Sequence, residues 1–427
     1  MKSIIKKFIP KKVLSWYHMM WPFLGALIYR YPSKKLKVIG ITGTNGKTTT
    51  THLASYLLEQ SGIEVASVSS LRFKIGKKEW DNKLKMTMPG RMKLQKFMRQ
   101  AVNAGCTHLV MEVTSEGVKQ NRHRFIKFDT AVFTNLTKEH IENHGNFENY
   151  KKAKGRFFSI QHRLSIVNFD DNHAEYFLGF SAKEKIGYTT KDALIADNAL
   201  IKIISAENIK HSSTGISFDI EGSKFSIPML GSFNIDNSLA AIGIGLGHGI
   251  SIEKAADILN NFEGVPGRME VIIDKPYTVI ADYAHTPDAL IKVYKTIENI
   301  NTREGGGKMI CVLGSAGGGR DKWKRPEIGK IASEYCDQII LTDEDPYTED
   351  PKQILQDIES GILNFGSKIP KILDRRDAIH KGLELAKKDD VVIVTGKGAE
   401  PLMVTASGSI PWDDREVIKE EYTKLYK

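Results

Sequence analysis

A glycine-rich segment near the start of the chain has the composition of a phosphate site. Glycines let backbone N–H groups approach phosphate oxygens, and the N-terminus of a following helix adds partial positive charge. Lys47 is expected to reach the β- and γ-phosphates of a nucleotide, and the Thr48 hydroxyl is expected to bind Mg²⁺. Only two residues separate Gly43 from Gly46, so the spacing departs from the usual P-loop. A chance glycine-rich turn is the alternative, but a strand before the segment and Lys-Thr at its end favour an ATP site made of Gly43, Thr44, Asn45, Gly46, Lys47, Thr48 and Thr49.

Two other stretches could complete a phosphoryl-transfer site. Glu112 ends a predicted strand, so it can face the glycine-rich segment across the carboxyl edge of the sheet. His140 is a candidate metal ligand: a lone histidine is more often structural, but a polar loop after an apolar run is a position that raises the odds of a ligand. Making an amide from a free carboxylate requires activation, and an acyl phosphate formed from ATP with metal ions nearby provides it. A ligase of this kind would therefore need a carboxylate and an imidazole near the phosphate segment, which Glu112 and His140 could supply.

Alternating strand and helix patterns must position these residues. In the first half we expect strands at 37–42, 65–69, 108–112 and 130–134, and helices at 48–61, 91–104, 237–247 and 252–261. A β-rich insertion is predicted between about Ala193 and Met229. Strands that alternate with helices indicate a mostly parallel, covered sheet.

A second α/β unit follows a predicted hinge at Gly264-Val-Pro-Gly267, with strands expected at 278–281, 309–313, 338–341 and 391–394. The predicted fold class is α/β, with a P-loop central ATPase domain and a C-terminal Rossmann-like domain. The predicted division is a basic apolar segment at 1–36, an ATP-binding domain at 37–266 and an amino-acid-binding ligase domain at 267–427.

Composition indicates an ordinary globular protein. The chain has 427 residues, of which 41% are apolar and 26% charged, so extensive disorder is excluded. The three cysteines, Cys106, Cys311 and Cys336, are far apart and form no C-x-x-C pair. We therefore expect three free thiols in a reducing cytosol, and neither a disulfide framework nor a zinc ribbon.

The net charge of +10 is concentrated at the N-terminus. Residues 1–37 contain no acid, and an apolar run from Val13 to Tyr29 lies between two groups of cations. This run is short for a spanning helix. A helix lying on an anionic membrane surface is the preferred interpretation, and a helix packed on the body or a spanning helix are the alternatives. The nine cations are Lys2, Lys6, Lys7, Lys11, Lys12, Arg30, Lys34, Lys35 and Lys37.

A series of motifs in one order resembles the Mur ligases, and most closely those that add the third residue to a muramoyl dipeptide. The resemblance runs from about Val38 to Trp412. Its motifs are Gly43-Thr-Asn-Gly-Lys-Thr-Thr49, Met111-Glu-Val-Thr-Ser115, Phe133-Thr-Asn-Leu-Thr137, Glu139-His140, His144-Gly145, Tyr150-Lys-Lys-Ala-Lys154, Gly231-Ser-Phe-Asn234, Asn237, Gly267-Arg-Met-Glu270, Asp282-Tyr-Ala-His-Thr-Pro-Asp288, Arg320-Asp-Lys322, Lys324-Arg-Pro326, Gly396-Lys-Gly398 and Glu400.

The resemblance implies a role for each matching residue of the nucleotide site. Glu112 and His140 match Mg²⁺ ligands alongside Thr48, and Lys154 matches a lysine that family members carry as a carbamate, which would support a second Mg²⁺. Asn237 matches an adenine contact, Arg268 a γ-phosphate contact and Asp282 a ribose contact. The implied catalytic residues are Lys47, Glu112, His140, Lys154 and Arg268.

The resemblance also implies two substrate regions. The muramoyl dipeptide would contact Thr87, Thr114, Ser115, Gln120 and Arg122. The family's Thr-Thr-Pro is Thr87-Met-Pro89 here, and its usual histidine is Glu116. The incoming amino acid would meet Arg320 through its α-carboxylate, and the remaining predicted substrate contacts are His285, Asp345, Tyr347, Gly396 and Glu400.

The identity of the added amino acid is read from one segment. Relatives that add diaminopimelate have Asn-Pro-Arg where this chain has Asp345-Pro-Tyr347, and tyrosine cannot pair with a distal carboxylate as arginine does. Glu344 and Asp345 add negative charge that suits a cationic side chain. We therefore expect lysine or another basic amino acid rather than diaminopimelate.

The predicted function is an ATP- and Mg²⁺-dependent ligase acting on a muramoyl-peptide precursor in peptidoglycan synthesis. The relatives that this chain resembles begin with a domain that binds uridine diphosphate, whereas about 36 residues precede the first predicted strand here. A lipid-linked or a non-muramoyl acceptor is therefore one alternative. A folylpolyglutamate-type ligase and an inactive nucleotide-binding scaffold are the others. We expect a cytoplasmic monomer, at the inner face of the membrane if residues 1–36 bind there, and no nucleic-acid partner.

Overall fold

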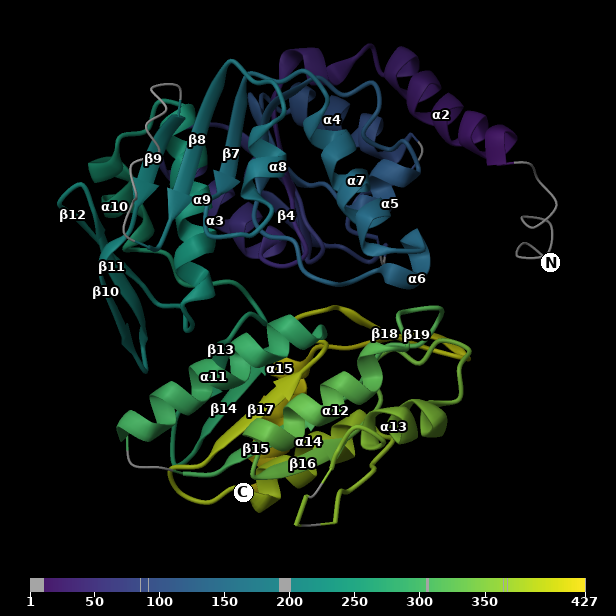
Figure 1. The fold of residues 1–427 in the computed structure, drawn as a ribbon, viewed down its shortest axis with the longest axis vertical. Coiled ribbons are helices and arrows are strands. Elements are labelled where there is room, and N and C mark those ends of the chain that lie inside the picture. The colour runs from purple at the N-terminus through teal and green to yellow at the C-terminus, as the bar shows by residue number, and fades with distance from the viewer. Residues whose placement is uncertain are drawn as a thin grey trace.

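The computed structural model describes residues 11–426 apart from 85, 91, 192–200, 305–306, 364 and 367. Two α/β halves lie one above the other, each built around its own sheet (Figure 1). Parts of three predictions lie outside the described residues: the lysines within 1–10, the beginning of the helix expected at 91, and the beginning of the β-rich insertion.

A nine-stranded sheet forms the centre of the first half, in the order β4-β3-β2-β5-β1-β6-β7-β8-β9. All neighbours from β2 to β9 are parallel, while β3 and β4 form an antiparallel edge. The predicted mostly parallel sheet is therefore confirmed. Its strands are β1 (Lys37–Thr42), β2 (Val65–Val68), β3 (Arg72–Ile75), β4 (Lys78–Asp81), β5 (His108–Glu112), β6 (Phe128–Phe133), β7 (Leu164–Asn168), β8 (Glu184–Thr189) and β9 (Ile201–Ser205).

Helices cover both faces of this sheet, because its central strands are buried on both sides. Ile39 and Ile41 of β1 pack toward α3 and α9, whereas Val38 packs toward the opposite layer. The helices are α3 (Lys47–Gln60), α4 (Lys93–Asn103), α5 (Ser115–Lys119), α6 (Ile141–His144), α7 (Phe147–Phe158), α8 (Ala174–Leu178), α9 (Phe233–Gly247) and α10 (Ile252–Leu259).

The predicted β-rich insertion divides between two sheets. Its first described strand, β9, extends the edge of the large sheet, and the other three form a separate antiparallel sheet. Phe218 and Phe225 stack with their ring centroids 5.2 Å apart, which attaches this small sheet to the core. Its strands are β10 (Glu207–Ser212), β11 (Gly215–Ile220) and β12 (Ser223–Ile227).

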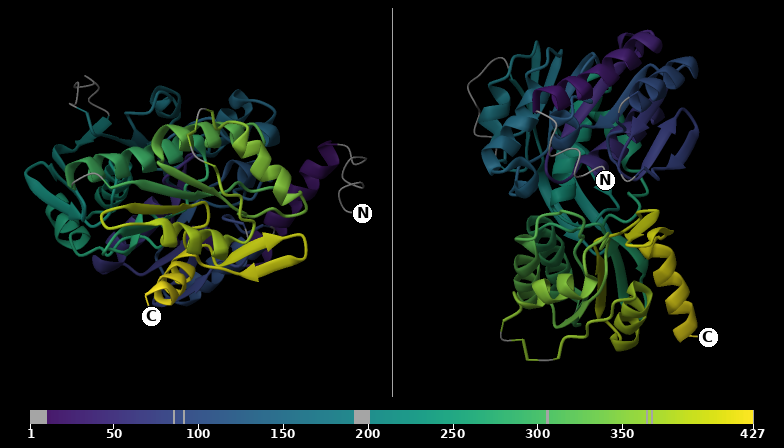
Figure 2. Two further views of the ribbon diagram at one scale, coloured as in Figure 1. Left: turned by 90° about the horizontal axis from the view of Figure 1, so that it is seen from below. Right: turned by 90° about the vertical axis from the view of Figure 1, so that its right-hand side faces the viewer.

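A five-stranded sheet, ordered β13-β14-β17-β15-β16, forms the second half. It is parallel except for β13 at its edge. The helix α15 and the small β18–β19 hairpin lie on the outside of this half (Figure 2). The elements are β13 (Glu270–Ile273), β14 (Thr278–Asp282), α11 (Pro287–Glu304), β15 (Met309–Leu313), α12 (Lys324–Tyr335), β16 (Gln338–Leu341), α13 (Pro351–Glu359), α14 (Arg375–Leu385), β17 (Val391–Thr395), β18 (Leu402–Thr405), β19 (Gly408–Pro411) and α15 (Asp414–Leu425).

The prediction of three free thiols is wrong for two of them. Cys311 and Cys336 form a disulfide, with their Cα atoms 6.1 Å apart, whereas Cys106 is free and buried. Cys311 lies in β15, and Cys336 ends α12 just before β16, the neighbouring parallel strand. The crossover back to the adjacent strand brings the two residues together, a proximity that their sequence spacing does not reveal.

The apolar run near the N-terminus forms the helix α2 (Lys11–Ile28), followed by the short helix η1 (Pro32–Lys35). Pro22, Gly25 and Ala26 are buried against the body, as the alternative of a packed helix expects for this part of α2. Within the described part of the chain, no helix has both the length and the apolar character needed to cross a bilayer.

Candidate active site

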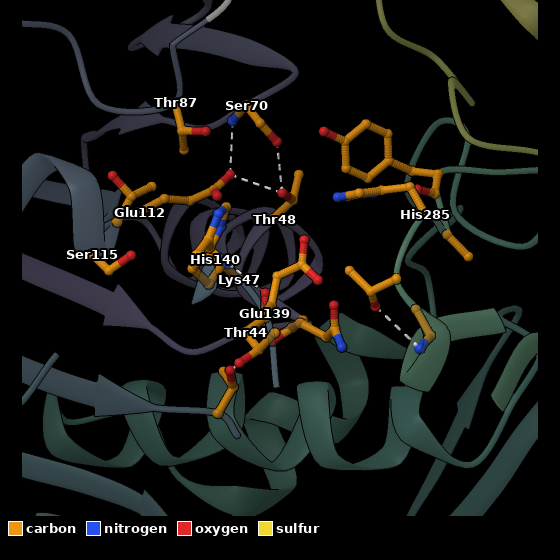
Figure 3. A pocket seen from close by; sticks show the side chains of 18 of the residues that line it. Thr44, Lys47, Thr48, Ser70, Thr87, Glu112, Ser115, Glu139, His140 and His285 are labelled. Atoms are coloured by element: carbon orange, nitrogen blue, oxygen red, sulfur yellow. Dashed lines mark hydrogen bonds between the residues drawn. The ribbon is translucent and has the colours of Figure 1, made fainter. Parts of the chain in front are cut away.

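A cavity of about 710 Å³ opens between the two halves. One wall is formed by the carboxyl ends of the central strands, and the facing wall, which carries His285, by loops of the second half (Figure 3). All but three of the predicted site residues line this cavity. The exceptions are Gly43, Lys154 and Gly396, which lie behind its wall.

The glycine-rich segment connects β1 to α3, as predicted. Gly46 precedes the first residue of α3 with a φ of 83°, and a Cβ there would lie 2.2 Å from the Asn237 side-chain oxygen. Both the backbone conformation and the lack of space at position 46 therefore require glycine. The Lys47 ammonium donates to the carbonyl oxygens of Gly43 and Thr44 at 2.9 and 2.7 Å. Lys47 is thus held over the segment that would receive the phosphates.

Thr48 and Glu112 are brought into direct contact. The Thr48 hydroxyl donates to Oε1 of Glu112 at 2.9 Å. The backbone N–H of Ser70 donates to the same oxygen at 2.7 Å, and its hydroxyl lies 2.8 Å from the Thr48 hydroxyl. The sequence analysis missed Ser70. The available signal was its position just after the predicted strand 65–69, at the sheet edge that holds Glu112.

Two lysine ammonium groups converge on one carbonyl oxygen. Nζ of Lys154, from α7, lies 2.7 Å from the Gly43 oxygen that also accepts from Lys47. Lys154 is completely buried and lies over the Tyr150 ring, 4.6 Å from its centroid. Burial, and then the charge of Lys47, lowers the pKa of Lys154 well below its usual value. Lys154 is therefore a buried amine that gives up its proton more readily than an ordinary lysine.

His140 also lines the cavity and begins α6 with a left-handed backbone. Burial, followed by the charges of Lys154 and Arg320, lowers the pKa of His140 to about 2. Its imidazole is therefore neutral near pH 7 and retains a lone pair that can bind a cation.

The loop after β6 supports the phosphate segment from the side. Asn135 accepts from the Asn45 backbone N–H at 2.8 Å and donates back to the Asn45 carbonyl at 3.1 Å. Thr134 donates to the same carbonyl at 2.7 Å. Asn237, predicted to contact adenine, instead uses its amide on Asn234 at 2.9 Å, while its side chain still lines the cavity.

The second half supplies a cation to the opposite wall. The Arg268 guanidinium lies over the Tyr283 ring, 4.1 Å from the centroid, and its Nε has no hydrogen-bond partner among the described residues. Asp282 accepts from the backbone N–H groups of Met269 and Ala284, both at 2.7 Å. Asp282 therefore fixes the backbone beside Arg268 in addition to lining the cavity.

His285 lines the cavity on the same side as Arg268 and has a neutral imidazole near pH 7. Burial, and then the charge of Lys324, lowers its pKa to about 3. Its Nδ1 lies 2.9 Å from the Tyr283 carbonyl oxygen, so Nδ1–H donates there and Nε2 is left as an acceptor.

The predicted acceptor residues gather at one end of the cavity. Arg122 donates to the Met88 carbonyl and to the Gln120 side chain, both at 2.6 Å. The Ser115 hydroxyl lies 3.2 Å from Nε2 of His144, and Thr114 caps the start of α5. These hydroxyl and guanidinium groups suit a carboxylate-bearing ligand.

The acidic residues predicted to attract a cationic amino acid differ in their partners. Asp345 accepts from Lys397 through both oxygens at 3.0 Å, and Glu400 accepts from the same ammonium at 2.6 Å. Glu344 is buried, and its Oε2 has no hydrogen-bond partner among the described residues. Burial raises the pKa of Glu344, although Lys324 opposes the shift. The Asp345 carboxylate is already paired with the Lys397 ammonium, whereas Glu344 has an oxygen that could accept a hydrogen bond from a bound cationic group.

Tyr347 is the residue on which the expectation of a basic amino acid partly rests. Its backbone is left-handed, with a φ of 54°, and its side chain packs over Gly318. The Arg320 guanidinium forms a hydrogen bond with the Tyr347 side chain. Arg320 is therefore the cation at this end of the cavity, and Tyr347 adds no second one.

Buried pairs connect the two halves beside the cavity. Nζ of Lys324 lies 3.2 Å from Oε1 of Glu139 and 3.0 Å from the His285 carbonyl oxygen. The Asp321 carboxylate accepts from the backbone N–H groups that begin α6, both at 3.0 Å. Neither Glu139, Lys324 nor Asp321 was predicted as a site residue, although all three belong to motifs quoted for the resemblance. Contacts across the two halves are invisible in one sequence.

The donor atoms fit Mg²⁺ when nucleotide phosphates complete its shell. Among the described residues, no group of three or more histidine, cysteine, aspartate and glutamate side chains could hold a metal ion. Mg²⁺ commonly binds one or two carboxylates together with substrate phosphates and waters. The Thr48 hydroxyl, the Glu112 carboxylate and the neutral His140 imidazole provide such a partial set.

Comparison with known proteins gives one consistent answer. The Mur ligase middle domain matches residues 41–245, and the Mur ligase glutamate ligase domain matches residues 267–398. A UDP-N-acetylmuramoyl-L-alanyl-D-glutamate–2,6-diaminopimelate ligase from Clostridium acetobutylicum is 38% identical over 94% of this chain and 81% of its own. A UDP-N-acetylmuramyl-tripeptide synthetase from Roseiflexus sp. is 34% identical over the same shares. A solved diaminopimelate ligase structure has a TM-score of 0.62 at 29% identity, covering 94% of this chain and 82% of its own.

Proposed function

The chain belongs to the Mur ligase family and is an ATP-dependent amide ligase, and we propose that it adds an amino acid to the D-glutamate carboxylate of a muramoyl dipeptide. The observation that carries this proposal is the arrangement of three groups around one cavity. The Lys47 phosphate site, the Arg122 acceptor end and the Arg320–Glu344 amino-acid end face the same space. An acyl phosphate formed at the first site can therefore meet an amine from the third.

In the proposed first step, the D-glutamate carboxylate attacks the γ-phosphorus of ATP and ADP leaves. Arg122 would orient the acceptor, while Lys47 and Arg268 offset the charge that develops on the phosphoryl group. Mg²⁺, when bound, would offset further charge, and Thr48, Glu112 and His140 would hold it. The contact between Thr48 and Glu112 supports this assignment, because it places two hard oxygen donors together.

In the second step, the α-amine of the amino acid attacks the acyl carbon and inorganic phosphate leaves. Arg320 would hold the α-carboxylate of the amino acid so that its amine points toward the acyl carbon. The buried Glu139–Lys324 pair would keep the two halves closed and exclude water that would otherwise hydrolyse the acyl phosphate. We place the nucleotide-binding domain at 37–266 and the amino-acid-binding domain at 267–427.

The role of Lys154 follows from its lowered pKa. A neutral amine can attack CO₂, and loss of a proton then leaves an anionic carbamate. The carbamate of Lys154 would then carry a negative charge next to the Lys47 ammonium, and the two groups would attract each other. The proposal is supported by the short distances from both amines to the Gly43 oxygen.

We propose a basic amino acid such as lysine as the preferred substrate. The partnerless Oε2 of Glu344 could accept from a distal ammonium group. Diaminopimelate carries an additional distal carboxylate, and Tyr347 supplies no cation for it. One of the relatives described above is a diaminopimelate ligase. The proposed preference for lysine would therefore distinguish this chain from that relative.

Phosphate release by the purified protein tests the proposal. ATP, Mg²⁺ and UDP-muramoyl-L-Ala-D-Glu are supplied with lysine, ornithine or diaminopimelate singly. Release that depends on both the dipeptide and one amino acid is expected. Release without the dipeptide, or none with any amino acid, would contradict the proposed acceptor.

One observation favours a second acceptor. The helix α2 has an exposed apolar face and contacts Phe125, in the turn that carries Arg122. A muramoyl dipeptide carried on a lipid would then be the acceptor, with the same chemistry in the cavity.

A further inference from the structure

The outward face of α2 is apolar over most of the helix. Between residues 16 and 28, every exposed side chain of the helix is aromatic or aliphatic. Trp16 is 62% exposed, Phe23 40% and Leu27 45%. Their spacing places them on one stripe of the helix. Contiguous exposed apolar surface of this kind marks an interaction site. The full set is Trp16, Tyr17, Met19, Phe23, Leu27 and Ile28.

The opposite face holds α2 in place. Gly25 packs closely against Met92 and Gln95, at the start of α4. A Cβ atom at Gly25 would lie 3.2 Å from the nearest atom of each of these two residues. The Arg99 guanidinium donates to the carbonyl oxygen of Tyr29 at 2.9 and 2.7 Å, just beyond the end of the helix. The apolar stripe is therefore presented by a fixed helix and not by a loose tail.

The sequence next to this stripe is basic. Residues 1–37 contain nine lysine and arginine residues and no acid, whereas the whole chain has a net charge of +10. Arg30, Lys34 and Lys35 follow α2 directly and are exposed. An exposed apolar stripe followed by exposed cations is complementary to anionic lipid headgroups over an acyl layer.

We propose that α2 lies in the plane of an anionic membrane surface, with Trp16, Met19, Phe23 and Leu27 at the boundary between headgroups and acyl chains. Trp16 and Tyr17 suit this depth, because their rings have an apolar body and a polar edge. No described helix could cross a bilayer, which agrees with a helix that lies on the surface.

The position of α2 links this surface to the active site. The Phe23 and Phe125 rings are 5.3 Å apart, and Arg122 lies in the same turn as Phe125. Figure 1 and the right view of Figure 2 place α2 at the end of the first half that is distant from the second half. Membrane binding would therefore hold the turn that carries Phe125 and Arg122 near the bilayer, with the second half farther from it. This consequence rests on the proposed function, whereas the membrane contact itself does not.

Flotation with lipid vesicles tests the proposal. The full-length protein is mixed with vesicles of phosphatidylcholine alone, or of phosphatidylcholine with phosphatidylglycerol, at low and high salt. We expect flotation with the anionic vesicles and less of it at high salt. Trp16→Ser combined with Leu27→Ser should lower the partition coefficient by about tenfold or more, because two large apolar side chains no longer enter the lipid.

Leu363→Ser is the matched control, because Leu363 is 70% exposed on the second half, and it should float like the wild type. Flotation of the double variant at the wild-type level, or none of the wild type, would overturn the proposal. Sedimentation velocity tests the alternative that a second copy of the chain covers the stripe. If the wild type is a dimer and the double variant is a monomer, the stripe is a dimer interface and the proposal is overturned. Turnover of the UDP-linked dipeptide is measured in parallel. Its absence in a protein that floats would contradict the proposed function and leave the membrane contact standing.

Discussion

The ammonium group of Lys324 lies 3.2 Å from Oε1 of Glu139, and the two side chains are only 3% and 6% exposed. Glu139 belongs to the first half of the chain and Lys324 to the second, so this ion pair closes the cavity between them. Glu139 also has an oxygen without a hydrogen-bond partner among the described residues, and burial raises its pKa. Lys324 is thus the cation that compensates a buried carboxylate where the two halves meet.

Removing that cation should open the two halves. Lys324→Ala leaves the Glu139 charge buried and unpaired, which destabilises the closed arrangement by about 3–5 kcal/mol. We expect kcat to fall by about a hundredfold or more, with little change in ATP affinity, because Lys47 and its loop are untouched. Steady-state kinetics and nucleotide binding measure both. Lys371→Ala, which breaks the exposed pair with Glu359, is the control and should behave as wild type. A Lys324 variant with normal kcat would refute the closing role.

Lys154 should carry a carbamate. Burial lowers the pKa of Lys154, so its amine gives up a proton more readily than that of an ordinary lysine, and only the uncharged amine reacts with CO₂. With carbon-13-labelled bicarbonate we expect a carbamate signal in the NMR spectrum that is absent from Lys154→Met and present in Lys152→Ala, a change at an exposed position on the same helix. Removal of CO₂ should also slow turnover. A wild-type protein that is fully active without CO₂ and shows no signal would exclude the carbamate.

The sequence predicted the strands and the phosphate segment well, because their signals are local. β5, β15 and β16 have the predicted bounds, since short apolar runs end at polar or turn residues. Contacts between distant segments could not be predicted. The Glu139–Lys324 bond joins residues 185 positions apart, and the Cys311–Cys336 disulfide depends on the crossover through α12. The balance of Asp345 by Lys397 was also hidden, so two acids that look equivalent in the sequence differ in the folded chain.

Tyr347→Arg should increase the use of diaminopimelate. The new guanidinium would lie beside Arg320, and a distal carboxylate between the two cations would relieve their repulsion. We expect kcat/KM for diaminopimelate to rise relative to that for lysine. Tyr347→Phe removes the hydroxyl without adding charge and should leave the ratio unchanged. If the arginine variant keeps the wild-type ratio, position 347 does not select the amino acid.

Recognition of a basic side chain should weaken in acid. Burial raises the pKa of Glu344, so this carboxyl takes up a proton at a higher pH than an ordinary glutamate. Below that pKa it is neutral and no longer attracts an ammonium group. The KM for lysine should therefore rise as pH falls, more steeply than the KM for ATP. Glu344→Gln should have a high lysine KM that changes little with pH. A pH profile identical in the two proteins would remove Glu344 from the recognition of the side chain.

Phosphate release from ATP and Mg²⁺, with UDP-muramoyl-L-Ala-D-Glu and single amino acids, tests the central claim most directly. The account predicts release that requires both the dipeptide and a basic amino acid, with lysine or ornithine exceeding diaminopimelate, and no release from Lys47→Ala. Release that ignores the dipeptide, or that Lys47→Ala leaves intact, would contradict the assignment of the cavity as the site of a muramoyl-peptide ligase.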